Sequence, residues 1–500
     1  MNITVELPPG LTSDNTTYST PGRWADGSNI RFRGGFPQVI GGWSSLTSQA
    51  LTGVCRNIHA WTDNSGTLNI AFGTHSALQI YLGGELSDIT PTGLAAGSID
   101  AAAGPGWGAG AWGDETWGTP RTLSGPRTWS LSTYGESLIA CPSGETIYQW
   151  TNDAETVAAP LSNAPARVTF AMVTPERQVL AFGCNEEVSG TYNPLCIRGS
   201  DIEDITDWTT STTNNAFEVI LEGGGRIVAA AQLGQFVAVW TDNGLHLGQF
   251  IGQIGQAYRF DKVADNCGLI GPNAVAVLGQ TAYWLSPDLR FRAWQVGTPP
   301  QIIECPIRNE FDDNIEAAQR EKIVATTISS YGEVWWHYPD SRDGTENSRY
   351  LMFTTLSGTW SKGIMARTAA IDAGVVGFPL MCDPDGFVFY HETGDTANGG
   401  ALEWFLESSD QYIGNADKVF MVRGVWPDFE RQGGPVSMTV NVRQYPQSTV
   451  RVRGPYTLDA GRRLRDFRAT GRLVAMRFEG ATGDVRFGKQ TFDVVETGGR

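Results

Sequence analysis

The sequence has few cysteines and histidines for its 500 residues. The seven cysteines are an odd number, and no two of them form a C-x-x-C pair. This spacing favours small buried side chains in a reducing compartment over a disulfide framework or a zinc site. The five histidines lie too far apart in sequence to suggest a metal motif.

Long apolar runs are also missing. No stretch of about 18 apolar residues occurs, so we expect no membrane span. The first ten residues, MNITVELPPG, lack the basic segment and apolar core of a secretory signal. Only residues 309–322 (NEFDDNIEAAQREK) predict a helix. Because 41% of the residues are hydrophobic and 60 are glycine, the composition favours an all-β protein with real cores and many tight turns.

Positive charge is scarce and unevenly placed. The chain has 36 Lys and Arg against 53 Asp and Glu, a net charge of −17. Residues 418–500 hold 15 basic against 8 acidic residues, whereas the other 417 residues hold 21 against 45. This asymmetry indicates a large acidic body and a basic C-terminal module. The acidic body is a poor general binder of nucleic acid, because phosphate binding needs Lys and Arg.

Seven stretches of the chain share one pattern, an apolar strand, a turn rich in Pro or Gly, and an aromatic strand. Residues 138–148 (LIACPSGETIY) align without a gap on 380–390 (LMCDPDGFVFY). The seven stretches start near residues 66, 135, 176, 234, 279, 332 and 377. A recurrence of about 40–50 residues, built of short antiparallel strands, is typical of a β-propeller. Seven blades are expected, with six or eight as alternatives; unrelated hairpins in β-sandwiches are the other interpretation.

One interval is lengthened by a glycine-rich insertion, residues 103–121 (AGPGWGAGAWGDETWGTPR). Its tryptophans, Trp107, Trp112 and Trp117, recur every five residues. Such a stretch predicts a long loop with aromatic anchors, folded onto its own domain or docked on another subunit.

From about residue 404 the pattern changes to strands in which apolar residues alternate with arginines, which predicts a small β-sandwich. The expected domains are an N-terminal hairpin segment (1–50), a propeller (51–398) and a basic sandwich (399–500). The arginines of this module balance the acidic body, contact acidic protein surfaces or contact DNA. The candidate subunit or adaptor contacts in the module are Arg462, Arg463, Arg465, Arg472 and Arg477.

Catalytic motifs are not evident. The chain has no GxSxG elbow, P-loop or HExxH motif. Residues 61–68 (WTDNSGTL) and 356–361 (LSGTWS) contain only fragments of the Ser-x-Asp-x-Gly-x-x-Trp box of propeller glycosidases. Acidic pairs such as Glu203/Asp204 and Asp312/Asp313 have no acid–base role that sequence can assign. We therefore expect no enzymatic activity, no cofactor and no metal site.

Three motifs, in their order along the chain, resemble a known family. The first is the hairpin 24–33 (WADGSNIRFR), which fits W-x-D-G-x-N-x-R-F-R, and the second is the loop 106–121. The third is the run 471–479 (GRLVAMRFE), followed by Arg-Phe-Gly at 486–488 and Gly-Gly-Arg at 498–500. Together these are similar to the tail nozzle or tail hub proteins of short-tailed bacteriophages, a group that resembles packaged-DNA stabilisation proteins. The middle of the chain matches only as a generic propeller.

The resemblance implies a structural virion protein without enzymatic activity. Six copies would form a homo-oligomeric ring below the head–tail adaptor, close the tail tube and give genomic DNA its exit path. Tail fibres, spikes or a needle would be further partners, and assembly would take place in the cytoplasm of the bacterial host. An acidic wall would keep DNA from sticking. The opening hairpin would close the propeller or brace the sandwich.

Two other functions stay open from the sequence. A carbohydrate-binding propeller would use the 17 tryptophans as sugar platforms and would work as a monomer. A propeller glycosidase would need carboxylates clustered over the propeller axis.

Overall fold

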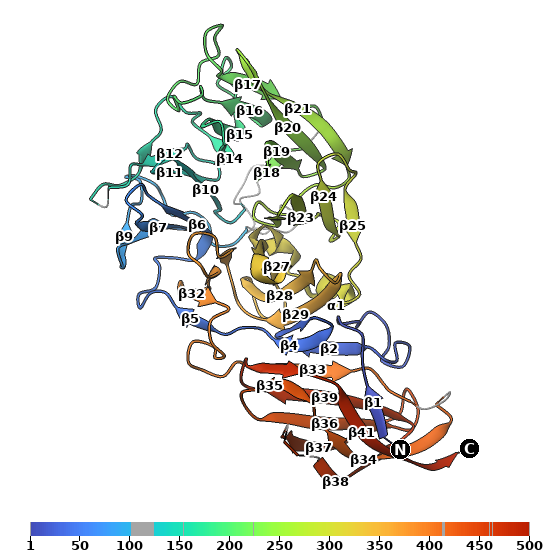
Figure 1. Ribbon diagram of the computed structural model, residues 1–500. Coiled ribbons are helices and arrows are strands. Elements are labelled where there is room, and N and C mark those ends of the chain that lie inside the picture. The colour runs from blue at the N-terminus through green and yellow to red at the C-terminus, as the bar shows by residue number, and fades with distance from the viewer. Residues whose placement is uncertain are drawn as a thin grey trace, which may run out of the picture.

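The computed structural model describes residues 2–101, 125–153, 155–223, 225–412, 416–459, 461–462 and 464–499. The chain is almost entirely β-structure and forms a round body joined to a smaller sandwich (Figure 1). The whole insertion at 103–121, with Trp107, Trp112 and Trp117, lies outside the described residues, as does Arg463.

The round body contains seven four-stranded antiparallel sheets, the blades. Blades 1 to 3 comprise β6–β9 (Cys55–Thr62, Leu68–Thr74, Leu78–Leu82, Glu85–Asp88), β10–β13 (Trp129–Tyr134, Ser137–Pro142, Tyr148–Trp150, Ala159–Pro160) and β14–β17 (Val168–Val173, Val179–Asn185, Tyr192–Gly199, Phe217–Ile220). Blades 4 to 6 comprise β18–β21 (Ile227–Leu233, Phe236–Thr241, Gly244–Gln253, Gln256–Asp265), β22–β25 (Val275–Leu278, Thr281–Leu285, Phe291–Gln295, Gln301–Ile303) and β26–β29 (Val324–Ile328, Glu333–Pro339, Asn347–Thr354, Thr359–Ile364). Blade 7 comprises β30–β32 (Ala369–Ile371, Leu380–Cys382, Val388–His391) and β5 (Trp43–Ser45).

The innermost strands of the blades close a ring. Each contacts the innermost strand of the next blade, and β30 contacts β6 to complete the circle. The prediction of a seven-bladed propeller is therefore confirmed, and the interpretation as hairpins in separate sandwiches is wrong. Each of the seven recurring stretches forms the second and third strands of one blade, from β7–β8 to β31–β32. The pattern was regular because these middle strands are buried on both faces.

The N-terminal segment closes the ring. Strand β5 pairs with β32 as the outer strand of blade 7, with Trp43 opposite His391 and Ser45 opposite Phe389. The last blade thus contains strands from both ends of the propeller sequence. This pairing joins the ring without a covalent bond.

The sandwich also takes strands from both ends of the chain. Its sheets have the orders β1-β41-β34-β38, β2-β33-β39-β36-β37 and β3-β4-β40-β35. The N-terminal strands are β1 (Asn2–Val5), β2 (Trp24–Ser28), β3 (Ile30–Arg33) and β4 (Phe36–Val39). The others are β33 (Trp404–Ser408), β34 (Lys418–Trp426), β35 (Phe429–Gln432), β36 (Val436–Arg443), β37 (Arg451–Leu458), β38 (Leu464–Gly471), β39 (Leu473–Gly480), β40 (Val485–Phe487) and β41 (Gln490–Gly499).

The tight hairpin between β3 and β4 turns at Gly34 and Gly35, whose φ angles are 58° and 87°. Glycine adopts positive φ at little cost, and two such residues in succession suit the turn that matches the twist of paired strands. The hairpin places β3 against β29 of blade 6, and β2 contacts β29 as well. One apolar core cluster includes residues of the sandwich and of blades 4 to 6.

The helix expected over 309–322 is broken in two, so this prediction was too long. The structure has α1 (Arg308–Asn314) and a 3-10 helix, η1 (Ala317–Lys322). Ile315 is extended and forms a β-bridge with Asp340, and the Glu316 side chain then accepts a hydrogen bond from the Ala318 backbone N–H. A further 3-10 turn, η2, spans Ser329–Tyr331. Tertiary pairing with the turn after β27 therefore outweighs local helix propensity.

Candidate functional site

The charged residues of the opening hairpin meet other elements at the junction, by which we mean the contact of β2 and β3 with blades 6 and 7. Arg31 of β3 is fully buried and forms ion pairs with Glu333 of β27 and Glu392 after β32. Its Nε lies 2.9 Å from Glu333 Oε1, and its Nη2 lies 2.8 Å from Glu392 Oε1. The guanidinium also stacks 3.7 Å from the centre of the Tyr331 ring. One side chain thus joins the hairpin to two blades.

Burial and neighbouring charges both act on the pKa values of Arg31 and Glu333. Burial opposes the charge of Arg31, but Glu333 and Glu392 outweigh it and raise the pKa of the guanidinium. Burial raises the pKa of Glu333 above its ordinary value although Arg31 lies beside it. The Trp335 indole N–H donates to Glu333 at 3.0 Å, and the Gly41 N–H donates to Glu392 at 3.2 Å. These bonds satisfy the carboxylate oxygens, as a buried ion pair requires.

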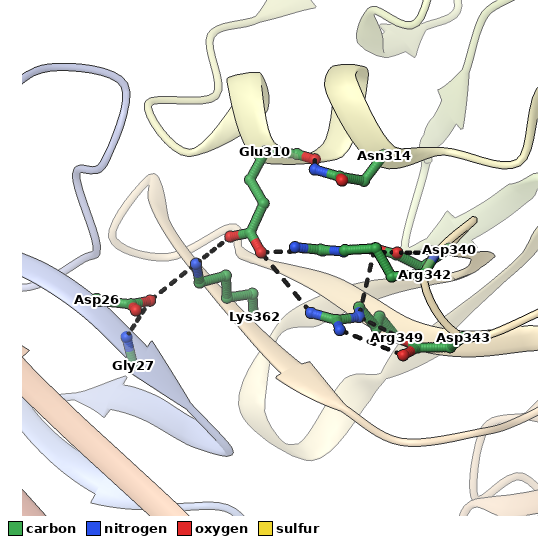
Figure 2. Close-up of polar contacts among 9 residues, drawn as sticks. All are labelled: Asp26, Gly27, Glu310, Asn314, Asp340, Arg342, Asp343, Arg349 and Lys362. Carbon is green, nitrogen blue, oxygen red and sulfur yellow. Dashed lines mark hydrogen bonds and ion pairs between the residues drawn. The ribbon is translucent and has the colours of Figure 1, made fainter.

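A second charged cluster connects β2 with α1 and blade 6 (Figure 2). Lys362 of β29 lies 2.8 Å from Asp26 of β2 and also pairs with Glu310 of α1. Burial opposes both charges, yet the opposite charge prevails in each case, so the pKa of Lys362 is raised and the pKa of Glu310 is lowered. Lys362 therefore links the sandwich to the propeller.

Glu310 extends the cluster into blade 6. Arg342 lies 3.0 Å from Glu310 and 2.7 Å from the buried Asp340. Arg349 of β28 lies 2.7 Å from Asp343. Figure 2 shows these side chains converging on Glu310, which α1 presents. The short helix α1 therefore holds Glu310 where it pairs with Arg342 and Lys362.

The other residues of the opening motif serve packing. Asn29 has a φ of 59°, donates to the Glu403 carbonyl at 2.8 Å and contacts the Tyr350 hydroxyl at 3.1 Å. Trp24 is buried in the sandwich core, with its ring edge-on to Phe478. Each polar residue of the motif thus has a different partner: Lys362 for Asp26, Tyr350 for Asn29, and Glu333 with Glu392 for Arg31.

A groove of about 800 Å³ runs along the junction. Its lining includes Trp43, Phe405, Arg477 and Glu479. Arg477, expected to contact another subunit, pairs with Glu407 at 3.3 Å and Glu479 at 3.2 Å of its own chain, and it stacks 3.8 Å above Phe405.

The other predicted arginines lie elsewhere. Arg472 is half-buried, with its guanidinium 5.3 Å from the centre of the Tyr445 ring. Arg462 is 84% exposed and pairs with Asp459. For Arg465 the backbone position in β38 opposite Gly424 is described. The structure does not bring these arginines together with Arg477 in one site.

The tryptophans of the described residues belong to the core. Twelve are buried, and the other two, Trp43 and Trp426, are partly exposed. A sugar platform needs an open aromatic face, so the described tryptophans give carbohydrate binding no support. The partial Asp box at 61–68 is a structural turn, because Asp63 accepts from the N–H groups of Ser65 and Thr67 at 2.9 Å.

The acidic pairs also have structural partners. Glu203 pairs with Arg177, and Asp204 accepts from Thr206. Asp312 pairs with Arg308. Within the described part of the chain, no group of three or more His, Cys, Asp or Glu side chains is placed to hold a metal ion. No described helix is both long and apolar enough to span a bilayer.

The described innermost strands contribute no acidic side chain to the propeller axis. The seven innermost strands, all of which are described, contain no Asp or Glu. Their one charged residue, Arg56, is buried and paired with Glu346 at 2.7 Å. These strands therefore give no support to an acidic DNA path along the axis of the single propeller.

Sequence analysis missed Glu333, Glu392, Glu310 and Lys362. A weak signal existed for Glu333, because it opens the strand EVWWHYP, in which every residue is buried. A carboxylate in such a strand needs a cation, but the sequence does not say that the cation is Arg31, 302 residues away. The long separation hides this pair from any local pattern.

No protein-family model matches the chain, and no curated protein matches its sequence. Solved structures similar to it include the computationally designed protein Ika8, with 14% identity over 70% of this chain and 99% of that chain and a TM-score of 0.39. The β-propeller domain of Myceliophteria thermophila Cps50 (Swd1) is 11% identical over 68% of this chain and 98% of that chain, with a TM-score of 0.41. The WD40 β-propeller domain of Doa1 is 10% identical over 70% of this chain and 97% of that chain, with a TM-score of 0.42. Likeness at this level carries no argument about function, and the fold rests on the sheets and on the contacts between their innermost strands.

Proposed function

We propose that this chain is a structural subunit of a short bacteriophage tail, a nozzle or hub protein that forms a ring of six and gives DNA its exit path. The observation that carries the proposal is the use of the opening motif. Asp26, Asn29 and Arg31, which the resemblance singled out, all connect the sandwich to the propeller. A subunit of a mechanical assembly needs its two bodies held in one orientation, and buried ion pairs at the junction supply that.

Charge supports the same function. The body outside residues 418–500 has 45 acidic against 21 basic residues, so its surface repels DNA and does not trap it. The basic sandwich faces protein in this proposal. Since the described innermost strands of the propeller contain no Asp or Glu, the DNA path in this proposal runs between subunits around the axis of the ring. The head–tail adaptor, and fibres, spikes or a needle, are the other partners.

Electron microscopy of the purified chain, alone and with the adaptor ring, tests the proposal. Particles with six-fold symmetry are expected, with a central opening between subunits. A chain that stays monomeric in intact virions would contradict it. Binding to a glycan array by the monomer would favour the carbohydrate-binding alternative instead.

A variant test addresses the basic module. Changing Arg472 and Arg477 to Ala is expected to impair ring or adaptor assembly and to leave any DNA affinity unchanged. Arg477→Ala also frees Glu407 and Glu479, so the matched control is Arg259→Ala, at an exposed position on β21 of the propeller whose loss frees Asp261. Intact assembly with lost DNA binding in a gel-shift assay would instead identify the module as a DNA clamp.

A further inference from the structure

The end of the sandwich farthest from the propeller carries arginines without partners. We define the basic edge as β37 and β38, the outer strands of their two sheets. The first five residues of β37 are exposed, including Arg451 and Arg453, and Arg468 of β38 is exposed too. Among the described residues, these three arginines have no ion-pair partner within 4.0 Å.

A complementary surface lies on the propeller. We define the acidic turn face as the turns after the first and third strands of blades 1 to 3, at 63–67, 83–84, 135–136, 151–153, 155–158, 174–178 and 200–216, together with Glu85, the first residue of β9. Its exposed acidic residues include Glu85, Glu136, Asp153, Glu155, Glu203 and Asp204. Its one basic residue, Arg177, is already paired with Glu203. The equivalent turns of blades 4 to 6, from Gly234–Gln235 to 355–358, contain no charged residue.

Hydrogen bonds show that these turns form one surface. The Asn64 N–H donates to Glu136 at 2.8 Å, which connects blade 1 to blade 2. The Tyr134 hydroxyl donates to the Glu203 carbonyl at 2.8 Å, which connects blade 2 to blade 3. The negative charge is therefore concentrated on one side of the ring.

The two surfaces cannot meet within one chain. Strands β37 and β38 lie at the opposite end of the molecule from blades 2 and 3 (Figure 1). The basic edge also cannot pair with its own copy, because arginines on both sides would repel, and charged edge strands generally resist edge-to-edge pairing. A contact between unlike surfaces of identical chains is heterologous, and such contacts generate a ring when the rotation between copies closes and an open filament when it does not.

We propose that the basic edge of one copy docks on the acidic turn face of the next copy. The inference rests on the proposed function and names the surfaces that build its ring. Arg451, Arg453 and Arg468 provide the positive side, where Arg can bind carboxylates through two parallel hydrogen bonds. The part of the acidic body on blades 1 to 3 then meets a neighbouring subunit, and the rest of the acidic surface remains for the DNA path.

Charge reversal tests the contact. The edge variant R451E/R453E/R468E and the face variant E85K/E155K each place like charges across the interface. In analytical ultracentrifugation at low salt, each variant alone is expected to self-associate at least about 10-fold more weakly than the wild-type chain. A mixture of the two variants restores opposite charges at both kinds of contact, so assemblies of alternating variants are expected to form.

The control is R259E/K262E on β21, which reverses two exposed basic residues that are paired within their own strand region. It is expected to assemble like the wild-type chain. Rings from either single variant, or no rescue on mixing, would overturn the docking proposal while six-fold wild-type rings would still support the nozzle function. Loss of DNA binding without loss of assembly in the edge variant would overturn it in favour of nucleic acid as the occupant. A wild-type chain that stays monomeric at low salt would also overturn it, whereas the nozzle function would still be judged by the particles formed with the adaptor.

Discussion

Arg31 shows how one residue can determine the arrangement of the whole molecule. Its two carboxylate partners lie on different blades, and all three side chains are at least nine-tenths buried. Replacing a complete buried ion pair with apolar residues is often harmless, whereas removing one partner leaves an unpaired charge. The cluster therefore matters more for the position of the hairpin than for stability in absolute terms.

Arg31→Ala is expected to lower the free energy of unfolding by about 3–5 kcal/mol, because Glu333 and Glu392 would stay buried without their cation. Arg33→Ala in the same strand is the control, since Arg33 is exposed and should cost less than about 1 kcal/mol. Urea denaturation followed by fluorescence measures both values. Equal effects of the two substitutions would contradict the importance given to the buried cluster.

The pH dependence of stability is expected to depend on two histidines between blades 6 and 7. Burial, with Arg367 nearby, lowers the pKa of His337 to about 3 and the pKa of His391 well below its ordinary value. The unfolded chain binds these protons near pH ~6.5, so stability is full above about pH 6.5 and is lost as the pH falls below it, by about 1.4 kcal/mol per pH unit for each histidine. His337→Gln should reduce this slope between about pH 6 and about pH 5, whereas His75→Gln, at a half-buried position, should reduce it less. Urea midpoints across that range decide; an unchanged slope in His337→Gln would contradict the assignment.

The sequence indicated which residue types matter, but it did not indicate which residues they contact. The motif W-x-D-G-x-N-x-R-F-R marked Arg31 as important, yet neither Glu333 nor Glu392 lies in a recognisable motif. The candidate contact arginines of the sandwich all lie between 462 and 477, and they leave out Arg468, which lies within that range. Arg451, Arg453 and Arg468 could not be separated from Arg477 by sequence, because exposure and pairing depend on which strand becomes a sheet edge.

At the element scale, short N-terminal strands complete sheets formed by distant parts of the chain. Strand β1 pairs with β41, β2 pairs with β33, and β5 pairs with β32. The hairpin pattern of the propeller was visible in sequence because each unit is local. The pairing of β5 with blade 7 was not visible, since a three-residue strand has too little pattern to indicate its partner.

Residues 400–500 alone are expected not to fold, because each sandwich sheet lacks at least one N-terminal strand in that fragment. The same fragment joined through a flexible linker to residues 1–45 regains β1 to β4 and is expected to give a cooperative thermal transition. Circular dichroism and proton NMR distinguish the two. A folded 400–500 fragment would contradict this prediction, because it would show that the sandwich folds without its N-terminal strands.

At the scale of the whole molecule, the two bodies share one apolar core cluster and two charged clusters. Such a contact is more extensive than a flexible linker, which would let each body move separately. The core cluster that the two bodies share was not predictable from composition, which indicated separate acidic and basic modules. Charge describes the surfaces, whereas the continuity of the core depends on how β2 and β3 pack on β29.

The wild-type chain is expected to unfold in one calorimetric transition, because breaking the junction exposes core residues of both bodies. Weakening the junction with Lys362→Met, which leaves Asp26 and Glu310 without their shared cation, should separate the sandwich transition from the propeller transition. Differential scanning calorimetry provides the measurement. Two transitions in the wild-type chain would indicate that the bodies are energetically independent.

The pairing of β5 with β32 also has a consequence for synthesis. Residues 43–45 leave the ribosome long before their partners at 389–391 have been synthesised. The interval between the synthesis of β1 and that of its partner β41 is longer still. Domains usually fold as they emerge, but this ring cannot close and this sandwich cannot form until nearly the whole described chain has been made. An interrupted translation product would keep an open blade and unpaired strands, which proteases attack readily. The N-terminal strands thus delay the completion of both bodies until their C-terminal partner strands have been made.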